Sequence, residues 1–352
     1  MAAGLFLNGL SLNVSKYPDC APELIEFRNL NRRIPRDRTY FDWRYLGRPC
    51  AAAPIVVWAE NEGQRVGALT IFPHDFYVLD GEYPLGVLGD ISVRIECRGL
   101  GIAGAMFRFM TQIEALRSLY GCLVLPNEDA ARPLRKSGWH DANRIERFAK
   151  VLDIGSRFSE RAGSSLQRIL AAPLNLLMRG LTYEGLYHSR RYRAVLVSHL
   201  DDGFDELWRG AEKHGQIIGV RDARYLRWRY QHHPLNTYRM LAIMDSDNVC
   251  GYAMYRLAGS LCLVEDAFCR EPSRHATHVV GLLLAHLREQ TSASGVSVSI
   301  NRSVLNFPWR RFGFLRRADY QQVMTSDCSS MNTNLHAVDA ARWHVTAGDK
   351  DV

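Results

Sequence analysis

The fold prediction rests chiefly on the stretch LGVLGDISVRIECRGLGIAGAM at residues 85–106. Its first part, LGVLGDISVR at 85–94, is an apolar run typical of a buried strand. An amphipathic run begins at Ile102 and predicts a helix to about Leu119. The RGLGIA turn at 98–103 lies between them, so its glycines open the helix and leave backbone N–H groups at the positive end of the helix dipole. Such a turn can bind a pyrophosphate, and Arg98 adds a positive charge.

Composition indicates a folded protein with room for two domains. The chain has 352 residues, of which 47% are hydrophobic and 23% are charged. The net charge of +7 favours an anionic partner, such as coenzyme phosphates, acyl carrier protein, tRNA or an anionic membrane surface. A generally basic surface with no such partner explains the charge equally well.

Cysteine usage and apolar segments predict a cytoplasmic protein without a metal. The eight cysteines include no CxxC pair, and no His/Cys cluster has the spacing of metal ligands. A chain of this size does not need disulfides, so reduced thiols are expected. The N-terminal apolar patch lacks a preceding basic residue, so it is a poor signal peptide. Arg168, Pro173 and Arg179 interrupt the most apolar segment, 166–181, and no membrane span is expected.

The chain contains an internal repeat. RDRTYFDWRY at 36–45 returns as RDARYLRWRY at 221–230, with six identities at one offset. Further matches follow in the same order, and they are Asp90 with Asp266, Arg94 with Arg270, Asn127 with Asn301, and Gly138 with Gly313. We interpret this order as a tandem duplication.

Residues that both copies share are expected to be structural. Trp43, Trp228, Tyr45 and Tyr230 are therefore expected in the core, and Arg44 and Arg229 are expected to pair with carboxylates such as Asp37 and Asp222. The alternative is that Trp43 and Arg44 form part of an acceptor site. Each copy contains short strands followed by one crossover helix, which predicts an α/β fold with a mixed, mostly antiparallel sheet flanked by helices. The expected boundaries are a first domain at 1–153, a helical connector at 154–193 and a second domain at 194–352.

The RGLGIA turn resembles the phosphate loop of the GNAT acyltransferases, Gln/Arg-x-x-Gly-x-Gly/Ala. The resemblance implies two tandem GNAT-like domains and a coenzyme A thioester, acetyl-CoA by default, as the donor substrate. In this family the strand before the loop contributes main-chain groups to the pantetheine arm and to the carbonyl oxygen. The resemblance therefore assigns coenzyme binding to ten residues: Ile91, Ser92, Val93, Arg98, Gly99, Leu100, Gly101, Ile102, Ala103 and Asn127.

The second copy lacks the glycines of this loop. We align RHATHV at 274–279 with the loop of the first copy, so side chains at 275 and 277 would crowd an approaching phosphate. Coenzyme binding is therefore expected in the first copy alone, with the second copy degenerate and shaping the acceptor site. In the alternative interpretation, His275 and His278 bind a different anion.

Candidate catalytic residues are Asp90 as a general base and Ser92 as a proton donor. A structural role for Asp90 is the alternative, because Asp266 is its counterpart in the other copy. The family commonly has a tyrosine general acid where this chain has Leu134. Tyr83, Tyr120 and His140 are the other candidates to protonate the leaving thiolate.

The C-terminal WHVTAGDKD at 343–351 is similar to the endings of some tandem GNAT proteins of bacterial surface-polysaccharide pathways. The resemblance implies that Asp349 and Asp351 line the acceptor site and hold an amine. The alternative is a disordered acidic terminus.

The sequence therefore predicts an N-acyltransferase that transfers an acyl group to a small amine, such as an amino sugar or amino acid. Acyl carrier protein remains an alternative donor. Two other functions stay open, an aminoacyl-tRNA-dependent transferase and a non-catalytic acyl-CoA sensor or scaffold. The intact phosphate loop argues against the tRNA-dependent enzyme, and the missing tyrosine favours the sensor. Basic and aromatic residues do not interleave as in RNA-binding proteins, so nucleic acid is not expected.

Overall fold

The computed structural model describes residues 9–30, 32–155, 165–301, 307–326 and 335–350. Its strands are β1 (Leu10–Lys16), β2 (Ile55–Asn61), β3 (Gln64–Val78), β4 (Gly81–Val93), β5 (Cys122–Val124), β6 (His140–Val151), β7 (Tyr192–Val197), β8 (Ile217–Gly219), β9 (Arg239–Asp245), β10 (Asn248–Ala258), β11 (Leu261–Cys269), β12 (Gly295–Ile300), β13 (Leu315–Ser326) and β14 (Trp343–His344). Its helices are α1 (Ala21–Leu30), α2 (Arg38–Tyr45), α3 (Ile102–Phe109), α4 (Glu128–Lys136), α6 (Ser165–Gly180), α7 (Tyr183–Leu186), α8 (Asp202–Arg209), α9 (Ala223–Leu226) and α10 (Pro272–Gln290).

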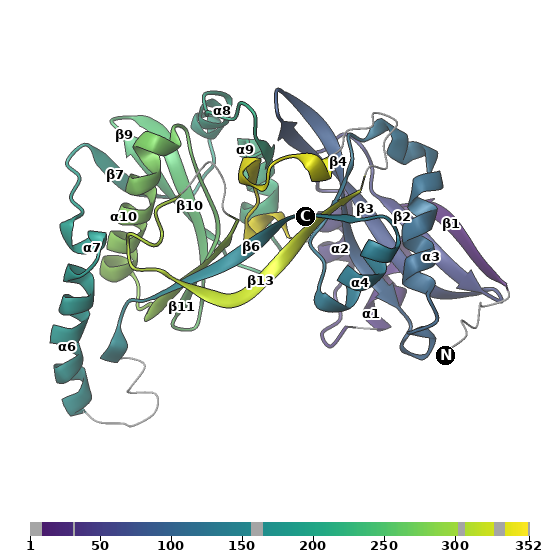
Figure 1. Cartoon of the computed structure of the whole chain (residues 1–352), viewed down its shortest axis with the longest axis horizontal. Coiled ribbons are helices and arrows are strands. Elements are labelled where there is room, and N and C mark those ends of the chain that lie inside the picture. Colours follow the sequence, from purple (N-terminus) through teal and green to yellow (C-terminus); the bar gives the residue numbers. More distant parts are fainter. Residues whose placement is uncertain (1–8, 31, 156–164, 302–306, 327–334, 351–352) are drawn as a thin grey trace.

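One sheet runs through both halves of the molecule, with helices packed on it (Figure 1). Its strands follow the order β1-β2-β3-β4-β5-β13-β6-β12-β11-β10-β9-β7, and most neighbours are antiparallel. Two pairs of neighbours are parallel, β4 with β5 in the first half and β11 with β12 in the second. Each half therefore has one parallel pair, at the equivalent position of its strand order. The helices α3 and α10 make these two crossovers. The predicted α/β fold with a mostly antiparallel sheet is therefore confirmed.

The last strands of the two halves are exchanged. β6, from the first half, pairs with β12 of the second half, whereas β13, from the second half, pairs with β5 of the first. β6 and β13 also pair with each other and lie at the centre of the molecule (Figure 1). Each half therefore completes its sheet with a strand from the other half.

Some predicted helix boundaries differ from the structure. α3 ends at Phe109, and short 3-10 turns at Met110–Gln112 and Glu114–Ser118 follow in place of the helix expected to Leu119. α10 begins at Pro272, two residues before the expected phosphate-loop counterpart at 274–279. The residues at 274–279 therefore belong to the helix, and in the described part of the chain the second half lacks the glycine turn, as expected.

The repeat positions a pair of tryptophans between the halves. Trp43 and Trp228 stack with ring centroids 5.4 Å apart, and the indole N–H of each donates to the main-chain oxygen of the other at 2.8 Å. Such reciprocal contacts are typical of two-fold related surfaces. The expectation that these tryptophans are structural is confirmed, and they join the two copies. Tyr45 and Tyr230 are buried, as expected.

The expectation that the repeat's arginines pair with carboxylates is confirmed for Arg44, with a different partner from Asp37, and is wrong for Arg229, which donates to main-chain oxygens. Asp37 and Asp222 cap helices α2 and α9, where their side chains accept hydrogen bonds from backbone N–H groups. Aspartate is a preferred N-cap residue, and here its carboxylate accepts a backbone hydrogen bond in place of an ion pair with an arginine of the repeat. Arg44 instead pairs with Asp90, at 3.0 Å.

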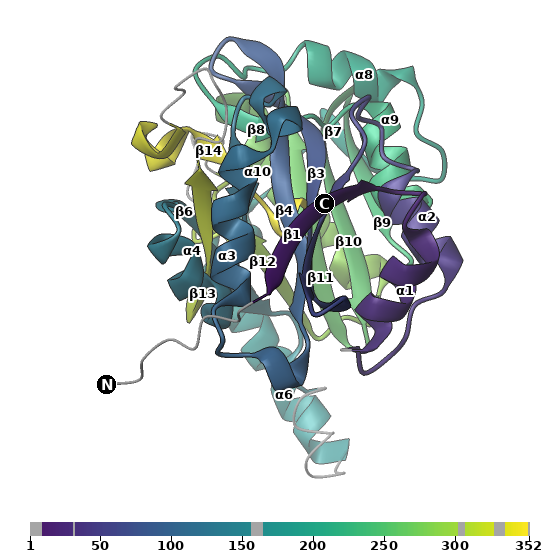
Figure 2. The same ribbon diagram turned by 90° about the vertical axis from the view of Figure 1, so that its right-hand side faces the viewer.

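Helices α1 and α3 lie on opposite faces of the first half's sheet (Figure 2). Side chains of a strand alternate between faces, and β2 shows this alternation. Val56 and Trp58 pack in the cluster that contains α1 and α2, whereas Ile55 and Val57 pack in the cluster that contains α3.

Cys122 is disulfide-bonded, so the expectation that all cysteines are reduced is wrong for this residue. The other six cysteines in the part of the chain that the structure describes are free thiols. Within the described ranges, no helix is long and apolar enough to cross a membrane, and no cluster of side chains is suited to hold a metal ion.

Candidate functional site

A cavity of about 1430 Å³ lies beside the C-terminal part of β4. Residues of β4, α1, α3, α4 and the loop before α3 line it. All ten residues predicted to bind the coenzyme belong to this lining, and they are Ile91, Ser92, Val93, Arg98, Gly99, Leu100, Gly101, Ile102, Ala103 and Asn127. The structure therefore brings together residues that span 36 positions of the sequence.

The cavity begins where β4 and β5 separate. Their parallel register covers only Gly86–Leu88 against Cys122–Val124. β4 then continues to Val93 without β5, while its other edge stays paired with β3. In the described part of the chain, no strand pairs with this side of β4 beyond Leu88. Unpaired backbone N–H and C=O groups need partners, so this edge is suited to bind an extended ligand.

A β-bulge marks the same segment of β4. The register with β3 passes from Gly89, opposite Thr70, to Ser92, opposite Ala68, so Asp90 and Ile91 together face one residue of β3. Asp90 has a φ of 48°, in the left-handed region that non-glycine residues rarely adopt. Bulges often occur beside active sites, where they redirect side chains.

The glycine turn before α3 is open. Gly99 and Gly101 have φ angles of 81° and 85°, and a Cβ at either position would have no atom within 4 Å. No side chain caps the N-terminus of α3, so its first N–H groups face the cavity without a side-chain acceptor. Together these features form a site for a phosphate group at the helix N-terminus.

Positive charge surrounds this end of the cavity. Arg98, Arg108, Arg132 and Lys136 all belong to the lining. Asn127 also lines the cavity, and its side chain caps α4 by accepting a hydrogen bond from the backbone N–H of Ala130 at 2.9 Å. The charges and the helix N-termini favour a polyanionic ligand such as a coenzyme pyrophosphate.

Asp90 is buried among arginines. Its carboxylate pairs with Arg44 at 3.0 Å and with Arg32 at 3.5 Å, and Tyr45 donates a hydrogen bond to it at 3.1 Å. Burial raises the pKa of Asp90, but Arg44, Arg28 and Arg32 outweigh that effect and lower the pKa to about 2. A carboxylate with such a low pKa is a weak base, so this position supports the structural alternative for Asp90.

Ser92 has a geometry that suits proton donation. Its Oγ accepts a hydrogen bond from Nη1 of Arg28 at 2.8 Å, and it lines the cavity. A hydroxyl that accepts such a bond keeps its own O–H for another partner. Of the two predicted catalytic residues, Ser92 is therefore the one whose hydroxyl proton is available to a ligand in the cavity.

The other candidates for a general acid lie outside the lining of the cavity. Leu134, which stands where the family commonly has a tyrosine, is fully buried in the apolar cluster beside α3. Tyr83 and Tyr120 contact each other with tilted rings and centroids 4.7 Å apart, and His140 stacks on His336. Among the described residues, the lining of the cavity contains no tyrosine or histidine.

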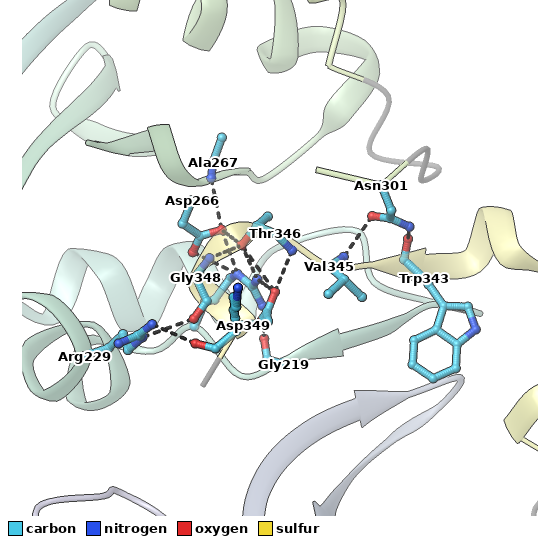
Figure 3. Close-up of polar contacts among 12 residues, drawn as sticks. Gly219, Arg229, Asp266, Ala267, Asn301, Trp343, Val345, Thr346, Gly348 and Asp349 are labelled. Carbon is cyan, nitrogen blue, oxygen red and sulfur yellow. Dashed lines mark hydrogen bonds and ion pairs between the residues drawn. The ribbon is translucent and has the colours of Figure 1, made fainter. Parts of the chain in front are cut away.

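The C-terminal segment is held by the second half (Figure 3). Arg221 donates to Asp349 at 2.7 Å and to Asp266 at 3.0 Å, and all three side chains are buried. Thr346 and Asp349 form a capping box at the 3-10 turn Ala347–Asp349. The carboxylate of Asp349 thus holds the segment in place and does not face the cavity, because Arg221 and the backbone N–H of Thr346 surround it. Asp351 lies outside the described residues.

This segment brings Lys350 to the cavity, a residue that the sequence analysis missed. Arg229 donates to the main-chain oxygens of Gly348 at 3.1 Å and of Lys350 at 3.0 Å, and Lys350 belongs to the lining. The sequence signal was present, since Lys350 lies between the two aspartates of the recognised ending. Only the fold shows that the second half carries it to the first half.

The second half has no open glycine turn at the equivalent place. Arg270 and Glu271 connect β11 to α10, and Pro272 is the first helical residue. His275 is buried and accepts a hydrogen bond from the backbone N–H of Glu271, and His278 stacks on Tyr192 with centroids 3.9 Å apart. Both histidines therefore have partners inside the protein.

Comparison with known proteins identifies the first half. Residues 30–118 match the family model described as an acetyltransferase (GNAT) domain. No curated protein sequence matches the chain.

Solved structures share the fold of the whole chain. A probable N-acyltransferase from Enterococcus faecalis has a TM-score of 0.65 at 10% identity, covering 93% of this chain and 74% of its own. A GCN5-related N-acetyltransferase from Anabaena variabilis has a TM-score of 0.62 at 16% identity, covering 91% and 73%. A tandem GNAT protein from the clavulanic acid biosynthesis pathway has a TM-score of 0.52 at 13% identity, covering 91% and 99%. Residues 30–118 are therefore similar to a GNAT acetyltransferase domain, and the chain has the fold of these solved structures, which include a tandem GNAT protein.

Proposed function

We propose that this protein is an N-acyltransferase that moves an acyl group, acetyl by default, from coenzyme A to the amine of a small acceptor. The observation that carries the proposal is the cavity of the first half. It combines the unpaired edge of β4, the open turn at Gly99 and Gly101, and the uncapped N-terminus of α3. Phosphates of acyl-CoA would bind at the turn, and the pantetheine arm would follow the edge of β4.

The proposed chemistry needs few side chains. The acceptor amine attacks the thioester carbonyl, and the new C–N bond gives a tetrahedral oxyanion. Collapse of this oxyanion breaks the C–S bond, and the coenzyme leaves as a thiolate. Backbone N–H groups of β4 at 91–93 would stabilise the oxyanion, since they are fixed in place before the reaction. Ser92 would supply a proton to the thiolate. Asp90 is a poor base, so solvent would accept the proton of the amine.

The proposal also assigns roles to the two halves. Residues 1–153 would bind the donor, 154–193 would connect the halves, and 194–352 would form a degenerate domain that completes the acceptor site. Six of the seven cysteines in the described part of the chain are free thiols and one, Cys122, is disulfide-bonded, and on this balance we propose the cytoplasm. A sensor that binds acyl-CoA without turnover is the second candidate, because Leu134 replaces the usual tyrosine of the family.

Calorimetry with acetyl-CoA and longer acyl-CoAs tests donor binding. We expect micromolar binding by the wild type and none by Gly101→Glu, because the new side chain is strained at positive φ and puts a negative charge where phosphate binds. Gly63→Glu is the matched control, since Gly63 has a φ of 78° and open space around it, but lies in the β2–β3 turn. Wild-type protein that does not bind any acyl-CoA would refute the proposal.

Thiol release in the presence of amines then separates the enzyme from the sensor. Release of coenzyme A that depends on an added amine supports the transferase. Tight binding of acetyl-CoA without release for any amine supports the sensor.

A further inference from the structure

The cavity reaches both faces of the first half's sheet. Its phosphate-binding end is formed by α3 and α4, whereas Arg28 and Arg32 enter the lining from α1 and the residues after it. α1 and α3 pack on opposite faces of the sheet (Figure 2). A donor bound at the glycine turn therefore leaves the cations of the α1 face available to a second ligand.

Arg28 is a buried cation without an ion-pair partner in the described part of the chain. It is 2% exposed, and its guanidinium donates to three neutral oxygens, those of Ala68, Ser92 and Thr70. Its Nε has no hydrogen-bond partner. A buried charge is costly unless an opposite charge lies close, and the one acidic residue in this end of the lining, Asp90, already pairs with Arg44.

Arg32 is held in place and shares the single carboxylate of Asp90 with Arg44. Its guanidinium lies over the rings of Tyr40 and Phe41, 5.3 Å and 5.4 Å from their centroids. Its contact with Asp90 is long, at 3.5 Å, and its side chain is 23% exposed. Cation–π contacts orient an arginine and leave its N–H donors for an anion.

Lys350 adds a third cation from the other half of the molecule. It is exposed, it lines the same cavity, and it forms no ion pair with the described residues. Arg229 fixes its main-chain oxygen, and the buried pair of Arg221 and Asp349 fixes the residue before it (Figure 3). A rigid segment therefore presents the ammonium group.

We propose that the acceptor carries an acidic group, a carboxylate or a phosphate, in addition to its amine, and that Arg32 and Lys350 bind this group. The inference rests on the proposed N-acyltransferase function. Arg28, Arg32 and Lys350 all line the cavity, whereas the one carboxylate beside the two arginines, that of Asp90, already pairs with Arg44 and Arg32. A bound anion balances the remaining positive charge. The acidic group then orients the amine toward the edge of β4, where the thioester would lie.

Matched pairs of amines test this inference. Coenzyme A release is measured with acetyl-CoA for amino acids against their amides, and for glucosamine 6-phosphate against glucosamine. We expect kcat/KM of the acidic member to exceed that of the neutral member at least about tenfold in one series, the effect of one charge-assisted hydrogen bond. The series that responds distinguishes a carboxylate from a phosphate.

Two variants assign the preference to residues. Arg32→Gln and Lys350→Gln are expected to raise KM for the acidic acceptor about tenfold each, and to leave KM for acetyl-CoA and for the neutral acceptor unchanged. Arg33→Gln is the matched control, because Arg33 is adjacent and exposed but does not line the cavity. A general folding defect would alter all of these constants together.

The outcomes separate the inference from the proposed function. Equal kcat/KM within every pair, or a preference that both variants retain, overturns the inference and leaves the transferase standing. Acetyl-CoA binding without turnover of any amine overturns the transferase. In that case, calorimetry of the CoA-saturated protein with glycine and glucosamine 6-phosphate decides the inference, since it requires binding of one of them that Arg32→Gln removes.

Discussion

Replacing Arg221 by methionine is expected to destabilise the protein strongly. The guanidinium of Arg221 is 1% exposed and joins two carboxylates, those of Asp266 and Asp349, which are 1% and 2% exposed. Methionine fills a similar volume but leaves both carboxylates buried without a counter-charge. Removing one member of a buried ion pair costs about 3–5 kcal/mol, and we expect a loss of that size in the free energy of unfolding at pH 7.

A surface arginine of similar geometry provides the control. Arg135 donates to Asp141 at 3.0 Å and 3.1 Å, but these side chains are 44% and 48% exposed. Exposed pairs contribute about 0–1 kcal/mol, so Arg135→Met is expected to change stability little. Urea titrations followed by tryptophan fluorescence give both free energies by linear extrapolation.

The pH dependence of the Arg221→Met variant tests the cause. Burial raises the pKa of Asp349, and Arg221 opposes this shift, so without the arginine the carboxylate protonates more readily and loses its buried negative charge at lower pH. The difference in stability between wild type and variant is therefore expected to shrink as the pH falls from 7 to about 4. A loss below about 1 kcal/mol, or one equal to that of Arg135→Met, would refute the view that this triad holds the C-terminal segment.

Three further predictions follow from the fold and the site. Trp43→Phe and Trp228→Phe are each expected to cost about 1 kcal/mol in urea titrations, and a double-mutant cycle should show coupling, because each indole donates to the other residue's oxygen. The fragment 1–153 is expected to give no cooperative unfolding transition by circular dichroism, because it lacks β13 and leaves β5 and β6 without a common neighbour. The pKa of Asp90, about 2, lies below the ordinary 3.8, so its ionised form stabilises the fold above about pH 4 and this contribution is lost as the pH falls through 2. Asp90→Asn should therefore cost about 2 kcal/mol at pH 7 and show less acid sensitivity than wild type in unfolding titrations between pH 4 and 2.

The sequence places most of the cavity lining because those residues are close together in the chain. Strand, glycine turn and helix follow each other within 85–109, and the glycines with positive φ are the residues that the turn requires. The predicted lining needed only one remote residue, Asn127. Its place at the N-cap of α4 follows from a short-range preference of asparagine.

The contributions of Arg28, Arg32 and Lys350 to the cavity were not predictable in the same way. These residues line one cavity because α1 packs on one face of the sheet and because the second half carries the C-terminal segment across. The exchange of β6 and β13 also has no local signal, since each strand has the same pattern whichever half it joins. Long-range pairing decides these contacts.

Equivalent residues of the two copies make different contacts. Arg44 and Arg229 occupy equivalent positions, yet Arg44 pairs with Asp90 beside the cavity, whereas Arg229 binds main-chain oxygens of the C-terminal segment. Because that segment brings Lys350 to the first half, a repeat residue of the second half now shapes the cavity of the first. Loss of the glycine turn in the second copy therefore does not make it dispensable. Changing Arg229 should alter acceptor kinetics in the first half while donor binding persists, which is the behaviour of a positioning residue.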